Sequence, residues 1–134
     1  MRLGLIEKYF QKLLEIINAS PVTRTSSVTF DKRSSVVGFI RGTVYFIDGT
    51  MLHFRELITI GEKISRDTYA YHYQQQGGDL IFRYDKAPHF PKLPNAPHHK
   101  HIGIAVEPVI GSPPDLDQVL KEIEDYIKPA ALSS

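Results

Sequence analysis

The chain contains no cysteine and no tryptophan, and it has no long apolar run. Without cysteine there can be no disulfide bond, thiolate metal site or cysteine nucleophile. No apolar segment approaches the roughly 18 residues that a membrane span needs. The apolar pattern at the N-terminus is interrupted by Glu7, Lys8, Lys12 and Glu15, whereas a signal peptide keeps its apolar region uncharged. We therefore expect a cytoplasmic protein without a membrane segment.

The net charge of +1 is unevenly distributed along the chain. Residues 1–101 hold 14 Lys and Arg against 9 Asp and Glu, whereas residues 102–134 hold 2 against 6. A mildly basic body with an acidic C-terminal segment permits an anionic partner without requiring one. A protein that coats DNA is usually far more basic.

Apolar periodicity predicts a helix at each end of the chain and strands between them. Residues 3–17 have helical spacing, and Ser20-Pro21 ends that helix. The second helix is expected to have Ser112 as its N-cap and to stop at Pro129. Alternating apolar residues between turn signals predict strands at 22–30, 36–47, 50–60, 63–75 and 80–85. The proline-rich residues 87–97 are expected to form a loop, and residues 101–110 can form one more short extended segment.

Consecutive hairpins predict an α+β fold over residues 1–134, a single domain. It would be a five-stranded antiparallel meander with the N- and C-terminal helices packed on one face. If each hairpin loop has two residues, Arg41 pairs with Glu56, His53 with Ala70, and His72 with Arg83. The expected core face carries Phe39, Tyr45, Leu52, Phe54, Ile58, Tyr69, Tyr71, Tyr73, Phe82 and Tyr84.

The opposite face would gather His53, Arg55, His72, Arg83 and Asp85. Histidine serves as acid or base near neutral pH, and arginine binds phosphate in a bidentate manner. This combination suits metal-independent cleavage of RNA. The competing interpretation is a solvated sheet face with polar cross-strand pairs.

Further candidates follow the proline-rich loop. His99 and His101 would point the same way in a strand and join the catalytic set, with His98 and Lys100 contacting phosphate. Asp85 could orient a histidine, and Glu56 could be a buried base or an ion-pair partner of Arg41. His99 and His101 with His53 or His72 and Asp85 could also form a zinc site, but no known ligand spacing is present. We therefore expect no cofactor and no metal.

Four segments taken together resemble a known family. They are Leu52-His-Phe-Arg-Glu56, Tyr69-Ala-Tyr-His-Tyr73, Leu80-Ile-Phe-Arg-Tyr-Asp85 with Ala87-Pro-His89, and Pro97-His-His-Lys-His101-Ile. In this order and spacing, with the Pro113-Pro114-Asp115-Leu116 helix start, residues 50–128 are similar to the TumE-type toxins of prokaryotic toxin–antitoxin systems. The resemblance implies a small toxin-like domain that a cognate antitoxin protein binds and neutralises. It does not assign a reaction.

Three functions remain open from the sequence. The chain could be a ribonuclease-like toxin, a non-enzymatic module that binds RNA or a protein, or a metal-dependent hydrolase. Whether it is an enzyme, and whether it forms a homodimer, is left open. The acidic helix at 114–128 is a candidate antitoxin surface.

Overall fold

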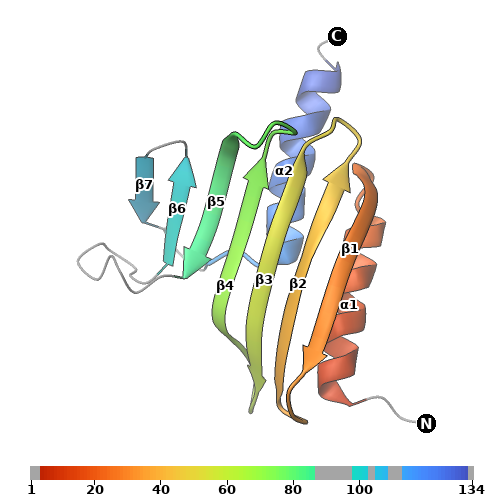
Figure 1. Cartoon of the computed structure of the whole chain (residues 1–134), viewed down its shortest axis with the longest axis vertical. Helices are drawn as coiled ribbons and strands as arrows, with labels where there is room; N and C mark the ends of the chain where they lie inside the picture. The colour runs from red at the N-terminus through yellow and green to blue at the C-terminus, as the bar shows by residue number, and fades with distance from the viewer. Residues whose placement is uncertain (1–3, 87–97, 103–104, 109–112, 133–134) are drawn as a thin grey trace.

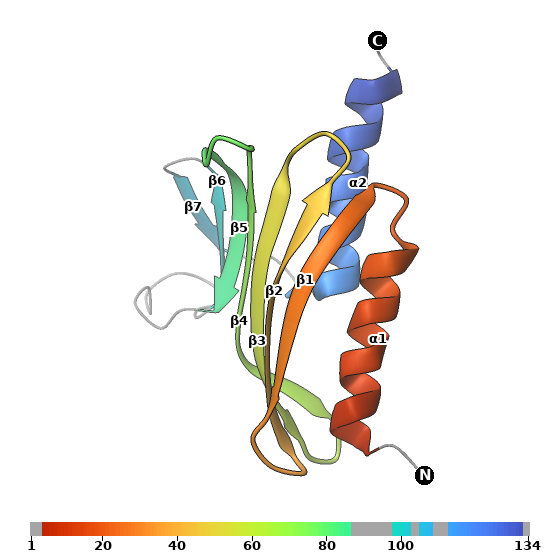
Figure 2. The ribbon, with the colours of Figure 1, turned by 45° about the vertical axis from the view of Figure 1, so that its right-hand side comes forward.

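The chain folds as an antiparallel sheet with two helices on one of its faces (Figures 1 and 2). The computed structural model describes residues 4–86, 98–102, 105–108 and 113–132. In chain order the elements are α1 (Leu5–Ala19), β1 (Thr23–Lys32), β2 (Val37–Phe46), β3 (Met51–Ile60), β4 (Ile64–Gln74), β5 (Leu80–Lys86), β6 (His98–Ile102), β7 (Ala105–Pro108) and α2 (Leu116–Leu132). The expected α+β class with both helices on one face is confirmed.

The sheet has more strands than the sequence predicted. Its described strands follow one another in the order β1 to β7, each antiparallel to the next, so the meander has seven strands and not five. The two additional strands are β6 and β7, which overlap the short extended segment expected at 101–110 and extend the sheet beyond α2 (Figure 1). The proline-rich residues 87–97 lie outside the described residues.

The core lies between the sheet and the helices. α1 buries Ile6, Phe10, Leu13 and Ile17. α2 buries its expected apolar stripe, Leu116, Val119, Leu120, Ile123 and Ile127. From the sheet come mostly aromatic and β-branched residues, with Tyr69, Tyr71, Tyr73, Phe82 and Tyr84 buried. These tyrosines are therefore core residues, as their alternation predicted.

Among the described residues no helix is both long and apolar enough to cross a membrane.

Both ends of α2 differ from the prediction. The helix begins at Leu116, three residues later than a Pro113 start requires, because Asp115 caps it. The Asp115 carboxylate accepts a hydrogen bond from the Gln118 amide at 2.9 Å, and the Gln118 side chain accepts one from the Asp115 amide at 3.0 Å. This is a reciprocal capping box. Ser112 lies outside the described residues. Pro129 does not end the helix, which continues to Leu132.

The β2–β3 hairpin loop is one residue longer than predicted, and this difference turns the β2 side chains to the opposite face of the sheet. The β2–β3 loop has three residues between Phe46 and Thr50, whose backbones are bonded at 3.0 Å. Gly49 closes it at φ 88°, which is the glycine-bulge form of a three-residue loop. His53 therefore pairs with Thr43, and Arg41 with Arg55 rather than Glu56.

Because of the same shift, the prediction that Phe39 and Tyr45 are core residues is wrong. Ile40, Val44 and Phe46 are the buried side chains of β2. Phe39 and Tyr45 lie instead on the face away from the helices, together with Arg41. Alternation along the strand fixes this result once the loop length is known.

Two further irregularities, one in the β3–β4 loop and one in β4, add up to a register shift of two residues. The β3–β4 loop also has three residues, since Ile60 pairs with Ile64. A bulge then leaves Asp67 without a cross-strand partner on β3, between the pairs Leu57–Thr68 and Ile58–Arg66. The register moves by two residues in all, so His53 pairs with His72 and not with Ala70, and the β4 side chains after the bulge keep their expected faces. Before the bulge the shift is one residue, which turns Arg66 to the helix side. The expected β4–β5 register, with His72 opposite Arg83, is confirmed.

We expect Gly49→Ala to lower the free energy of unfolding by about 1–2 kcal/mol, because an L-residue is strained at this positive φ. Urea denaturation measures the change. Gly77→Ala is the control, since Gly77 lacks a positive φ and a Cβ there meets no atom within 4 Å. Equal losses at the two positions would contradict the assigned role of Gly49.

Candidate functional site

The sheet face opposite the helices carries two adjacent rows of residues that are polar except for Ala70. In the first row Ser27, Thr43, His53, His72, Arg83 and His101 are successive partners from β1 to β6. In the second row the partners are Thr29, Arg41, Arg55, Ala70, Asp85 and His99. The rows are two residues apart on each strand, so their side chains share one face. The structure thus brings all six residues of the expected catalytic set to this face.

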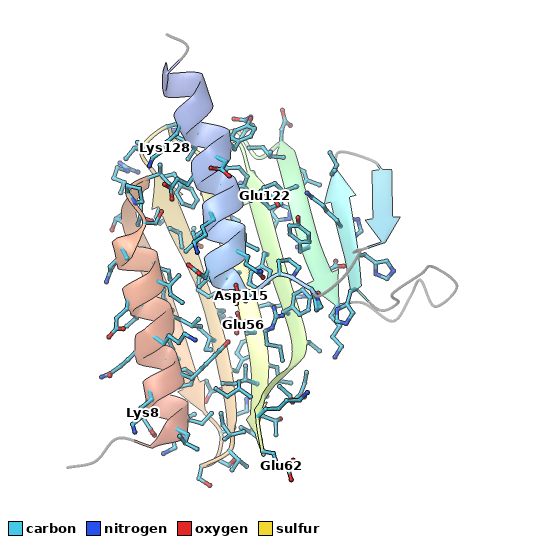
Figure 3. The ribbon with its side chains drawn as sticks, turned by 180° about the vertical axis from the view of Figure 1, so that it is seen from behind. Lys8, Glu56, Glu62, Asp115, Glu122 and Lys128 are labelled. Carbon is cyan, nitrogen blue, oxygen red and sulfur yellow. The ribbon has the colours of Figure 1, made fainter. Side chains whose placement is uncertain are left out.

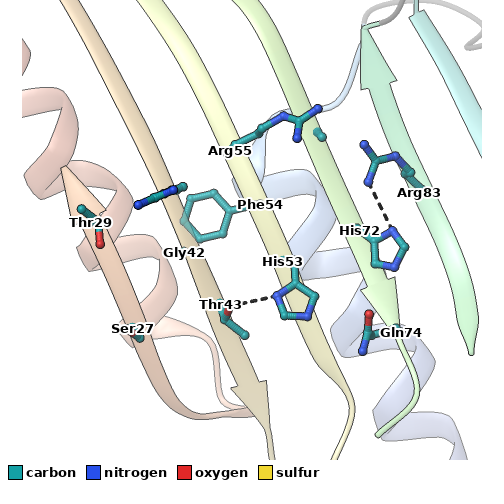
Figure 4. Close-up of a pocket in the computed structure, with 12 residues that line it drawn as sticks. Ser27, Thr29, Gly42, Thr43, His53, Phe54, Arg55, His72, Gln74 and Arg83 are labelled. Carbon is teal, nitrogen blue, oxygen red and sulfur yellow. Dashed lines mark hydrogen bonds between the residues drawn. The ribbon is translucent and has the colours of Figure 1, made fainter. Parts of the chain in front are cut away.

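A hollow of about 460 Å³ lies over the middle of these rows (Figure 4). Its lining comes from five neighbouring strands and includes Arg41, His53, Arg55, His72 and Arg83. We name this surface the His/Arg face. Because the lining residues are consecutive cross-strand partners, the hydrogen-bond ladder of the sheet fixes their spacing.

His53 and His72 form the centre of the hollow. Their ring centroids are 6.3 Å apart. The His53 Nδ1 atom is 2.9 Å from the Thr43 hydroxyl. The His72 Nδ1 atom is 3.3 Å from an Arg83 guanidinium nitrogen, and both contacts are drawn in Figure 4. A guanidinium only donates, so Nδ1 of His72 accepts and its ring proton resides on Nε2.

The surroundings of His72 favour its neutral form. Burial lowers the pKa of His72 below the ordinary value, and the nearby positive charges of Arg83 and, when protonated, His53 lower it further. These three causes disfavour the imidazolium ion, and a hydrogen bond with Gln74 only partly opposes them. His72 is therefore a neutral imidazole at neutral pH, while His53 is exposed to solvent.

Three arginines surround this pair of histidines, and two of them face one another directly. Arg41 and Arg55 are cross-strand partners and both are exposed. Like charges directly opposite one another destabilise a sheet. An anion bound between the two guanidinium groups would relieve that repulsion. Arg41 is the functional candidate that the sequence analysis missed, because the two-residue loop placed it on the core face.

A buried carboxylate organises the end of the site near β6. Asp85 is 8% exposed. One of its oxygens lies 3.1 Å from Nε of Arg83 and 3.3 Å from Nε2 of His101. Asp85 therefore holds both side chains in place, consistent with the orienting role considered for it. His99, the Asp85 partner across β5 and β6, is fully buried.

Three other candidates lie on the helix side of the sheet, away from the His/Arg face. His98 Nδ1 is 2.8 Å from the Tyr69 hydroxyl. Lys100 lies 4.9 Å from the centre of the Tyr84 ring and 3.3 Å from the Glu122 carboxylate. Glu56 is fully buried among aromatic residues. Lys100 is thus separated from His99 and His101 by strand alternation, rather than placed beside them.

Glu56 has different partners from the one expected. The hydroxyls of Tyr9 and Tyr71 donate to its two carboxylate oxygens, the Tyr71 bond being 2.6 Å long. Arg66 in turn donates to the Tyr71 hydroxyl at 2.8 Å and to the Pro114 carbonyl at 2.6 Å. Figure 3 places Glu56 close to Asp115, at the start of α2. This network connects β3, β4 and α1 to the beginning of α2, and Arg41 takes no part in it.

Burial is the main cause of the raised pKa of the Glu56 carboxyl group, and hydrogen bonds from Tyr71 and Tyr9 only partly oppose it. The same burial raises the pKa of Tyr69 to about 12. These groups lie on the side of the sheet that the helices cover, so they support the fold beneath the site. Among the described residues, no group of three or more His, Asp or Glu side chains is arranged to hold a metal ion.

A sequence model of one protein family, described as Toxin TumE, matches residues 13–129. The matched segment contains both histidines of the hollow and all three of its arginines. Comparison with curated proteins and with solved structures gives no match.

We expect Arg83→Gln to raise the pKa of His72, because the change removes a positive charge and partly uncovers the ring. NMR titration of the imidazole C–H signals measures this pKa. Arg55→Gln is the control, since it removes a charge from the same face without contacting His72. Equal shifts in both variants would contradict the assigned pairing of Arg83 with His72.

Glu56→Gln tests the buried network. The raised pKa means that folded Glu56 holds its proton to a higher pH than the unfolded chain, whose carboxyl titrates near about 4.3. Its contribution is fully present below that pH and is lost as pH rises through the folded pKa. Urea unfolding at several pH values should therefore show wild type losing stability relative to Glu56→Gln from about pH 4 upward. A relative gain over that range would contradict a raised pKa.

Proposed function

Because this chain belongs to the TumE toxin family, we propose that its toxic activity is the cleavage of RNA at the His/Arg face. Family membership makes it the toxin component of a toxin–antitoxin pair and implies a cognate antitoxin as its partner. The observation that carries the proposal is the pairing of His53 with His72 in a hollow that three arginines also line. This arrangement combines proton transfer groups with cations that bind a phosphodiester.

RNA suits this site because its 2′-hydroxyl is an internal nucleophile. Neutral His72 takes the proton from the 2′-hydroxyl as that oxygen attacks the adjacent phosphorus. The bond from phosphorus to the 5′-oxygen breaks, and protonated His53 donates a proton to the leaving oxygen. The products are a 2′,3′-cyclic phosphate and a 5′-hydroxyl, so protons and electrons balance without a metal or a redox partner.

Arg83 links substrate binding to the activation of His72. In the free protein its guanidinium occupies the Nδ1 lone pair of the ring at 3.3 Å. A phosphate that draws this guanidinium to itself frees Nδ1 to accept the 2′-hydroxyl proton. Arg55 and Arg41 then stabilise the additional negative charge that develops on the phosphate oxygens. Ring centroids 6.3 Å apart allow both rings to reach one phosphodiester, since each hydrogen bond spans about 2.8 Å.

Asp85 and His101 position Arg83 from the other side. The Asp85 carboxylate accepts a hydrogen bond from Nε of Arg83, so the terminal nitrogens, one of which contacts His72, point toward the hollow. His101 contacts the same carboxylate. Buried His99 lies below the surface and supports this end of the site without touching substrate.

Replacement of either histidine should strongly reduce RNA cleavage and relieve growth arrest. Loss of a general acid or base typically costs about a hundred- to ten-thousand-fold in rate, and we expect that range for His53→Ala and His72→Ala. Cleavage of labelled RNA by purified protein and growth after induction without antitoxin are the two measurements. Thermal melting verifies that the variants fold.

The matched control is His98→Gln, which changes a histidine on the opposite face of the sheet. Full cleavage and toxicity in both His53→Ala and His72→Ala would refute the proposed chemistry. A non-enzymatic binding module predicts a different result, in which affinity falls with each removed charge and no RNA product forms.

A further inference from the structure

We propose that the His/Arg face continues into a second subsite, formed by Phe39, Arg33 and Arg41, that takes an unpaired base of single-stranded RNA. The inference rests on the proposed function and specifies its substrate class. It starts from the corrected register of β2, which puts an aromatic ring and an arginine on the ligand side of the sheet.

The two subsites form a continuous surface. A second hollow of about 450 Å³ is lined by Phe39, Arg33, Asp31 and neighbouring residues of β1 and β2. It shares Thr29 and Arg41 with the hollow over the histidines. A chain that binds at His53 and His72 can therefore continue past Arg41 to Phe39 without leaving the sheet face.

The chemistry of the second hollow favours a nucleobase. Phe39 is half-buried, with the Arg33 guanidinium 5.2 Å from the centre of its ring. Bases of single-stranded RNA stack on aromatic rings and on guanidinium planes. The Arg33 side chain is 53% exposed, so it can move aside for a base or stack on it.

Asp31 separates the base from the phosphate along this track. Its carboxylate is 57% exposed and lies 3.4 Å from Nε of Arg33. A carboxylate repels phosphate but accepts hydrogen bonds from the amino groups of bases. The base consequently belongs at Phe39 and Asp31, and the backbone phosphate belongs at Arg41, where Arg55 adds a second positive charge.

The spacing sets a minimum length for the ligand. Phe39 is four residues from Thr43 along β2, which corresponds to about 13 Å at the rise of a strand. A stacked strand covers this distance in about four nucleotides at ~3.4 Å each, and a stretched strand needs fewer. A dinucleotide at the histidines therefore does not reach Phe39. Duplex RNA does not use the subsite either, because its bases are already paired and stacked.

Binding of 2′-O-methyl RNA tests the subsite apart from the chemistry, since this RNA lacks the attacking hydroxyl. The probes are a dinucleotide, a single strand of about ten nucleotides and the same length as a duplex. Fluorescence anisotropy with full-length protein should show that the long single strand binds more tightly than the other two probes. In Phe39→Leu this advantage over the dinucleotide should fall by roughly tenfold, as expected for the loss of one stacked base.

Two further variants keep the test interpretable. Phe39→Tyr retains the ring and should restore the advantage. Arg41→Gln should reduce the slope of log affinity against log salt by about 0.7, the value for one phosphate contact on a single strand. Lys8→Gln, which removes the same charge from the helix side of the protein (Figure 3), is its control.

The outcomes separate the two proposals. If wild type cleaves RNA but Phe39→Leu keeps the full advantage of the long single strand, the subsite inference is wrong and the proposed function stands. Equal binding of single strand and duplex would overturn the inference in the same way. If the dependence on Phe39 is found while no RNA is ever cleaved, the subsite stands and the proposed chemistry fails.

Discussion

The hydrogen-bond ladder of the antiparallel sheet is the constraint on which the site depends. In the first row of the open face, backbone hydrogen bonds hold each residue opposite its neighbour, from Thr43 through His53 and His72 to Arg83. Because side chains alternate along a strand, a slip of one residue would move a whole strand's contribution to the helix side. Loop lengths and the bulge at Asp67 therefore determine the composition of the site as directly as the site residues do.

The two faces of the sheet differ in kind: one packs against the helices, and the other carries the proposed site. On the helix side, Glu56 and its tyrosine and arginine partners connect the sheet to the start of α2, where Arg66 binds the Pro114 carbonyl. On the open side, Arg41 and Arg55 are held as cross-strand partners although like charges repel one another. A fold that gains its stability from one face can hold such an unfavourable arrangement on the other, which is typical of functional sites.

Much of this arrangement could be predicted from residue patterns. Alternating apolar residues between turn signals predicted the first five strands. Helical spacing of apolar residues predicted the buried stripes of both helices. The Gly77-Gly78 hairpin placed His72 opposite Arg83, as the structure has it. His53 and His72 could be assigned to one face, even though their pairing was missed. The one-residue shifts at the β3–β4 loop and at the bulge add up to two, and a shift of two residues leaves His72 on its expected face.

The remaining features depend on geometry that residue types do not specify. Asp48-Gly49 suits both a two-residue loop and a three-residue loop with a glycine bulge. Only the three-residue loop places Arg41 and Phe39 on the face away from the helices. Asp67 carries no sequence signal of a bulge. The partners of Glu56 come from α1, β4 and, through Arg66, the start of α2, so they follow from tertiary packing rather than from local pattern.

We propose that His53 and His72 cleave RNA through its own 2′-hydroxyl. The most direct measurement is the chemistry of the product ends after purified protein acts on a defined RNA in the presence of a metal chelator. Cleavage by the two histidines should give 2′,3′-cyclic phosphate and 5′-hydroxyl ends, and no cleavage where a 2′-O-methyl group blocks the attacking oxygen. Products with 5′-phosphate ends that form only when a divalent metal is supplied would contradict it.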